Sequence, residues 1–215
     1  MHLLLLAVAV GVLALLVQYG VLTVAFGKLG LSAHAAYLLL VTTLAGSLLN
    51  MPLFTIDSEN TGEAPAARLP PWLRLQTVGI PGKTLIAVNV GGCVVPVAFC
   101  LYLFFNSTVG MGETLLSVLA VSLIAHLFSR PIRGMGIGMP ILIAPLAAAA
   151  IAVSLGEEQT RAPLAYIGGT LGVLIGADLL RLKDIRKLGA PIASIGGAGS
   201  FDGIFLTGML AVLLA

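Results

Sequence analysis

Long runs of apolar residues, separated by shorter polar stretches, dominate the hydrophobic pattern of this chain. A transmembrane helix needs ~20 mostly apolar residues, and apolar runs of this kind recur from one end of the sequence to the other. The pattern predicts an all-α polytopic bundle of about seven membrane-spanning helices. The predicted spans are 3–26, 35–56, 83–105, 114–128, 140–155, 163–182 and a last one within 190–215 that glycines break.

The polar stretches leave no room for a separate soluble domain. We therefore expect residues 1–215 to form a single integral membrane domain. The longest polar stretch, residues 57–82, contains prolines, acids and arginines, and we predict that it is a cytoplasmic loop. The N-terminal MHLLLLAVAV lacks a basic region and a cleavage site, so it is interpreted as a retained first span.

Composition supports a membrane protein. The 215 residues are 59% hydrophobic and 9% charged, whereas soluble domains average roughly 25% charged residues. The lipid bilayer is the expected partner, and a net charge of +2 gives no indication of nucleic-acid binding. Cys93 and Cys100 are interpreted as small packing residues on one helix face, and we expect no metal or cofactor.

Basic residues are divided unevenly between the two sides of the predicted bundle. Only Lys28 and Arg161 belong to one side. Because Lys and Arg concentrate in cytoplasmic loops, we expect a multi-pass protein of the cell inner (cytoplasmic) membrane, with a cytoplasmic N-terminus and an external C-terminus. The residues on the predicted cytoplasmic side are Arg68, Arg74, Lys83, Arg130, Arg133, Arg181, Lys183, Arg186 and Lys187.

Two acids, Asp178 and Asp202, fall inside predicted spans. An ionisable side chain in a span is costly, so each is a functional hypothesis by default, and we predict that the two are catalytic. Asp178 precedes Arg181 by three residues, so an ion pair at a helix end is the alternative. Asp202 follows a stretch that cannot remain a stable helix, which contains Gly196, Gly197, Gly199 and Ser200.

Several polar residues are expected at a common depth. At ~1.5 Å per helical residue, Asp178, Asp202, Asn50, Asn89 and His126 fall about 6 to 10 Å below the predicted cytoplasmic boundary. Asparagines in spans often serve only as hydrogen-bonding groups between helices, and a histidine there is often merely interfacial. The predicted substrate-binding residues are Asn50, Asn89, His126, Gly196, Gly197, Gly199 and Ser200.

Glycines of the sixth predicted span recur every four residues, at Gly168, Gly172 and Gly176. Small residues at this spacing let two helices approach closely. Asp178 points well away from this stripe. We therefore expect the stripe to pack against one neighbour while the acid faces another neighbour or a cavity.

Some segments are familiar. AYIGGTLGVLIGADLLRL, GAPIASIGGAGSFDGIFLTG and IAVNVGG resemble segments of a prokaryotic multi-pass membrane family catalogued as a domain of unknown function, over most of the chain from Lys83 onward. More weakly, Gly199-Ser200-Phe201-Asp202 is similar to the Gly-x-Gly-Asp motif of presenilins, signal peptide peptidases and their archaeal relatives. This resemblance implies an intramembrane aspartyl protease in which Asp178 corresponds to the first acid.

The chain departs from the presenilin-type pattern at several points. Phe201 replaces the second glycine of the motif, and no tyrosine precedes Asp178. The later span that carries a Pro-Ala-Leu motif in those proteases has no counterpart here. The segment APIASI at 190–195 is the only candidate to replace that motif. These departures bear mainly on substrate binding.

Three functions are compatible with these residues. In an intramembrane aspartyl hydrolase, two adjacent carboxylates share a proton; the ionised one activates water and the protonated one donates to the carbonyl of a transmembrane peptide. In a cation- or proton-coupled small-solute transporter or channel, the same acids at a broken helix are ligands. In a non-catalytic membrane scaffold, the acids are merely structural.

Overall fold

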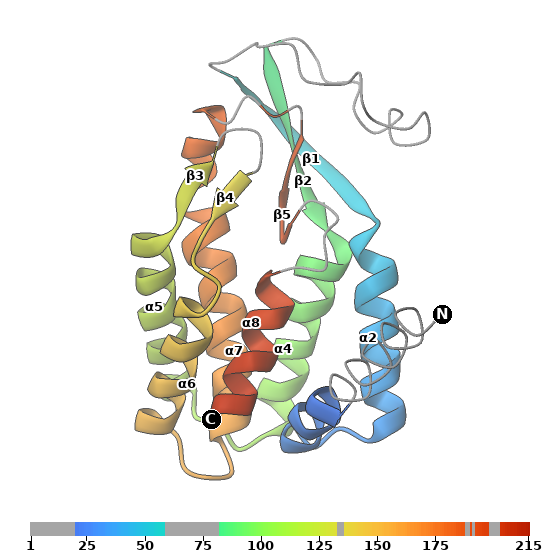
Figure 1. The fold of residues 1–215 in the computed structure, drawn as a ribbon, viewed down its shortest axis with the longest axis vertical. Coiled ribbons are helices and arrows are strands. Elements are labelled where there is room, and N and C mark those ends of the chain that lie inside the picture. The colour runs from blue at the N-terminus through green and yellow to red at the C-terminus, as the bar shows by residue number, and fades with distance from the viewer. Residues whose placement is uncertain (1–19, 59–81, 133–135, 188–189, 191, 198–202) are drawn as a thin grey trace, which may run out of the picture.

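The computed structural model describes residues 20–58, 82–132, 136–187, 190, 192–197 and 203–215. Within these residues a bundle of helices carries a small β-sheet at one end (Figure 1). Most of the first predicted span and of the predicted loop 57–82 lies outside the described residues.

The helices form the body of the molecule. They are Gly20–Lys28, α2 (Ala33–Ser47), α4 (Val95–Asn106), α5 (Met111–Phe128), α6 (Ile143–Leu155), α7 (Arg161–Val173) and α8 (Gly203–Leu214). A π-helical turn, η2 (Val90–Val94), leads into α4, and another, η3 (Leu174–Leu179), continues α7. A 3-10 helix, η4 (Leu182–Lys187), follows.

The sheet joins three segments that are distant in sequence. Its strand order is β1 (Asn50–Asp57), β2 (Lys83–Asn89) and β5 (Ile192–Ile195). β1 and β2 are antiparallel, with Asn50 opposite Asn89, whereas β5 pairs with β2 in parallel. A separate short hairpin consists of β3 (Arg130–Ile132) and β4 (Gly136–Gly138).

The prediction of an all-α bundle of seven spans is wrong. The predicted span 35–56 is α2 followed by β1, the span 83–105 begins as β2, and the last span begins as β5. Among the described residues, two helices are long and apolar enough to cross a membrane, Met111–Phe128 and Arg161–Leu179.

A third crossing is available only if a bent pair counts as one span. Gly20–Lys28 and Ala33–Ser47 pass the length and hydropathy test together, but they meet at 109°. Other described helices are apolar but shorter: Val90–Asn106, Ile143–Leu155 and Ile204–Leu214. Apolar helices that suit a membrane are therefore present among the described residues. Fewer of them are long enough to cross a membrane than the sequence pattern predicted.

The error has a local physical cause. Apolar runs do not distinguish a helix from a strand. The change from helix to strand after α2 and the change from strand to helix after β2 both fall within predicted spans. After α2, Pro52 cannot donate to a continuing helix, and Phe54, Thr55 and Ile56 favour strand. In the partner segment KTLIAVN, β-branched residues occupy every second position, which is typical of a strand.

Basic residues of the described segments gather at the end of the bundle that carries the sheet. The start of β2, β3 and η4 lie at this end (Figure 1), and they contribute Lys83, Arg130, Lys183 and Arg186. Lys28 belongs to the opposite end, where its Nζ donates to the carbonyl of Val212 at 3.3 Å. The side of the membrane on which each end lies stays a prediction.

The glycine stripe packs α7 and η3 against α5, as predicted. Gly168 faces Ser117, and Gly176 faces Ser122 and Ala125. A Cβ placed on Gly172 would lie 2.6 Å from Cβ of Val121, too close for both atoms. Glycine is therefore required for this helix-helix distance.

Gly172→Ala is expected to lower the free energy of unfolding by about 1–3 kcal/mol, because α5 and α7 must separate to admit the methyl group. Thermal unfolding in detergent measures the loss. Gly112→Ala in α5 is the matched control, since a Cβ there meets nothing within 4 Å. Equal losses in the two variants would contradict the role of the stripe.

Candidate functional site

Asp178 lies in η3, where α7 widens into a π-helical turn. Its Oδ2 accepts a hydrogen bond of 2.7 Å from the backbone N–H of Gly196. The glycine stripe of the same helix faces α5, so the acid faces a different neighbour, as predicted. π-helical turns inside helices often accompany functional sites, and here the turn carries the ionisable side chain.

The neighbour of Asp178 is a glycine turn that follows β5. Gly196 and Gly197 have φ values of +85° and +93°, a region that glycine adopts at little cost. The turn packs directly on η2: a Cβ on Gly196 would lie 2.6 Å from the carbonyl carbon of Gly92 and 2.7 Å from the Cys93 nitrogen. Glycine on both sides permits this contact between two backbones.

Asn89 joins the sheet to the helices. Its side chain is 1% exposed and stands between β2 and η2. Nδ2 donates to the Ser47 carbonyl at 2.7 Å and to Asn50 Oδ1 at 3.1 Å, and Oδ1 accepts from the Gly92 N–H at 2.7 Å. These bonds hold the end of α2, the start of β1 and the start of η2 together.

Asn50 extends this network to β5. Its Oδ1 also accepts a hydrogen bond from Ser194 Oγ at 2.6 Å. Ser194 is two residues before Gly196, which donates to Asp178. The predicted residues Asn50, Asn89, Gly196 and Asp178 are therefore connected through hydrogen bonds and a short stretch of backbone.

Sequence reasoning missed two residues of this site, Ser194 and Cys93. Ser194 has no local signal, because its partner Asn50 is 144 positions away. Cys93 is half-buried beside Gly196, the residue that donates to Asp178. The position of Cys93 directly after Gly91 and Gly92 was the only available signal.

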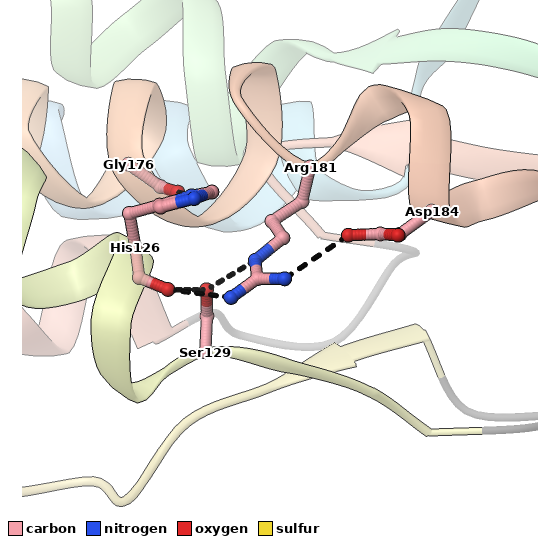
Figure 2. Close-up of polar contacts among 5 residues, drawn as sticks. All are labelled: His126, Ser129, Gly176, Arg181 and Asp184. Atoms are coloured by element: carbon pink, nitrogen blue, oxygen red, sulfur yellow. Dashed lines mark hydrogen bonds and ion pairs between the residues drawn. The ribbon is translucent and has the colours of Figure 1, made fainter.

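His126 belongs to a second cluster, at the junction of α5 and η3 (Figure 2). Its Nδ1 lies 3.3 Å from the carbonyl oxygen of Gly176. The Arg181 side chain reaches from the end of η3 toward α5 and donates to the His126 carbonyl at 2.7 Å and to Ser129 Oγ at 3.2 Å. The cluster fixes the backbone of η3 next to Asp178.

Arg181 makes its ion pair with Asp184, at 3.1 Å (Figure 2). Both side chains are partly exposed, 21% and 25%, so the pair contributes little to stability. The guanidinium is directed toward Asp184 and α5. Arg181 thus forms an ion pair with Asp184, and the alternative of an ion pair between Asp178 and Arg181 stays a prediction.

The second predicted catalytic residue, Asp202, lies outside the described residues, together with Gly199 and Ser200. Before this gap the chain contacts η3, and after it the chain enters an apolar cluster that includes part of η3. Gly196 donates to Asp178, and Ile204 belongs to the same buried apolar cluster as Ala177. Proximity of the two acids stays a prediction.

No group of three or more His, Cys, Asp or Glu residues suited to a metal ion occurs in the part of the chain that the structure describes.

Comparison with known proteins gives a family but no activity. The model of a family described as "Protein of unknown function (DUF1614)" matches residues 44–214. The match includes all strands of the sheet, both π-helical turns and the Asn50–Asn89 network. No curated protein and no solved structure matches the chain.

Proposed function

This chain belongs to the family of proteins of unknown function DUF1614, whose description states no activity, and from its own residues we propose that it is an intramembrane aspartyl hydrolase. Asp178 and Asp202 form the catalytic pair, and the substrate is a transmembrane peptide. The observation that carries this proposal is the 2.7 Å hydrogen bond from the Gly196 N–H to Asp178 Oδ2.

That bond supports a pairing of Asp178 with Asp202 because Gly196 lies shortly before Asp202 in the sequence. Only five residues separate Gly196 from Asp202. On the other side of the gap, Ile204 is buried with Ala177, the residue that precedes Asp178. The Gly196 hydrogen bond thus brings the chain to Asp178 shortly before Asp202, which favours a short distance between the two carboxyl groups.

The proposed reaction is peptide hydrolysis by general acid–base catalysis. Two carboxyl groups a few Å apart share one proton, because both cannot be ionised cheaply. The ionised group takes a proton from water as the water oxygen attacks the peptide carbonyl carbon. The protonated group donates to the carbonyl oxygen, and the C–N bond breaks as the leaving amine is protonated.

The sheet supports a peptide substrate. In the described part of the fold, β5 is an edge strand, paired with β2 on one side. The edge of a sheet can accept an extended peptide through backbone hydrogen bonds. A peptide aligned along β5 would run toward the Gly196 turn, whose N–H donates to Asp178.

A transporter is the second candidate, and the discontinuous helices favour it. η2 begins at the level of the Gly196 turn, and η3 interrupts the regular α-helix of α7 beside it. Transporters use such discontinuities, with an acid at the break, to bind cations.

One preparation separates these functions. The protein is reconstituted in proteoliposomes with a tagged single-span peptide, and peptide cleavage and cation flux are both measured. We expect cleavage, with the new termini located by mass spectrometry inside the apolar segment of the peptide. Cation flux without peptide cleavage would refute the hydrolase and support the transporter. If neither activity is measured, the non-catalytic membrane scaffold is the remaining candidate.

A further inference from the structure

The position of the Gly196 N–H is not determined by the turn itself. Gly196 and Gly197 both have positive φ, and glycine also populates many other conformations. β5 is only four residues long and pairs with β2 from Leu85↔Ile192 to Val88↔Ile195. The amide that reaches Asp178 therefore needs support from side chains outside the turn.

Ser194 provides that support from within β5. Its Oγ donates to Asn50 Oδ1 at 2.6 Å, which ties the strand across β2 to the start of β1. Gly197 N–H in turn donates to the Ser194 carbonyl at 3.2 Å. Ser194 thus anchors both the strand and the turn that presents Gly196.

Asn89 holds the acceptor of Ser194 in place. It donates to Asn50 Oδ1 and is itself bonded to the backbone of Ser47 and of Gly92. Asn89 is 1% exposed, so water does not compete for these bonds. A continuous path runs from α2 through Asn89, Asn50 and Ser194 to the Gly196 turn.

We infer that Ser194, Asn50 and Asn89 are positioning residues for Asp178. They fix the Gly196 turn so that its N–H donates to the carboxylate at 2.7 Å. This inference rests on the proposed function and deepens it, because it assigns the two asparagines to holding the acid rather than to substrate binding. None of the three is a catalytic residue, since each acts through the turn.

Ser194→Ala tests the inference, with Cys93 as the reporter. Gly196 packs on Cys93, so release of the turn exposes its thiol. Loss of one hydrogen bond of ordinary strength shifts an opening equilibrium about 2- to 10-fold, and we expect the rate of Cys93 alkylation by N-ethylmaleimide to rise by that factor. Peptide mass spectrometry follows each cysteine separately.

Cys100, 2% exposed in the bundle core, is the internal marker of global unfolding. Its alkylation rate should not change. Ser194→Thr keeps the hydroxyl and should restore the slow Cys93 rate. Thr84→Val is the matched control, because it removes a bond of 2.8 Å to the Ala190 carbonyl at the far end of β5 and leaves Ser194 intact.

A second readout reports on Asp178 itself. The infrared band of its carboxyl group is identified by subtraction of the Asp178→Asn spectrum. Ser194→Ala should shift this band, because the Gly196 hydrogen bond is weakened, and Thr84→Val should leave it in place. An unshifted band, an unchanged Cys93 rate, or parallel acceleration of Cys93 and Cys100 would each overturn the positioning role.

Neither readout needs a substrate. A protein that cleaves no peptide but shows both shifts would refute the hydrolase and retain the positioning network around Asp178. A protein that cleaves peptides but shows neither shift would retain the hydrolase and refute the network.

Discussion

Asp178→Asn and Asp202→Asn are each expected to reduce peptide cleavage at least ~10²-fold, the contribution of a single general acid or base. An amide can neither accept the proton from water nor supply one to the carbonyl oxygen. Because the two carboxyl groups act as a unit, the double variant should be no worse than either single variant. Initial rates of cleavage in proteoliposomes measure the effect.

The matched control is Asp184→Asn. Asp184 is an acid six positions after Asp178 and forms a partly exposed ion pair with Arg181. It has no place in the proposed reaction, and cleavage should be close to that of the wild type. A cation site predicts a different pattern, in which each Asp→Asn change weakens ion binding in steps and flux survives at high ion concentration.

Asn89→Leu is expected to produce the largest loss of stability, about 2–5 kcal/mol in the free energy of unfolding. The substitution keeps the approximate volume but removes the partners of the Ser47 carbonyl and the Gly92 N–H. Asn89 is 1% exposed, so water cannot replace those partners at the side-chain position. Denaturant titration in detergent measures the difference.

Asn106→Leu is the control with the same chemical change. Asn106 Nδ2 also donates to a backbone carbonyl, that of Tyr102, but this bond is exposed at the end of α4. Solvent replaces it, and a change within about 0.5 kcal/mol is expected. A similar loss in both variants would show that burial of the Asn89 network is not what stabilises the junction.

Local spacing predicted the correct features of α7. Residues four apart share a helix face, so Gly168, Gly172 and Gly176 had to lie together, and they pack against α5. The same spacing directed Asp178 to another neighbour, which is the Gly196 turn. These predictions succeeded because they needed nothing beyond the geometry of one helix.

The apolar pattern failed to predict the sheet because apolar residues indicate a nonpolar environment, which helices and strands can both occupy. The segments 50–57 and 83–89 adjoin apolar runs and were assigned to spans with them. They become strands because each supplies the other with hydrogen-bond partners, from Asn50↔Asn89 to Asp57↔Lys83. The third strand, 192–195, joins from more than one hundred residues away.

The expectation of a polar layer was useful even though its spans were misassigned. Asn50 and Asn89 were placed at one depth by counting along helices, and they are in fact cross-strand partners. Both residues stand at the junction between helix and sheet, and their depth in a membrane stays a prediction. His126 was grouped with them, and its Nδ1 lies next to the Gly176 carbonyl, two residues before Asp178.

By itself, the sequence determined that apolar runs recur along this protein, that α7 packs through glycines, and that Asp178 follows those glycines on the same helix. These properties follow from composition and from the 3.6-residue period of a single element. Only the tertiary structure decided that Gly196 donates to Asp178 across 18 positions and Ser194 to Asn50 across 144. Such partners are set by chain topology, because a hydrogen bond depends on the distance between atoms and not on their separation in sequence.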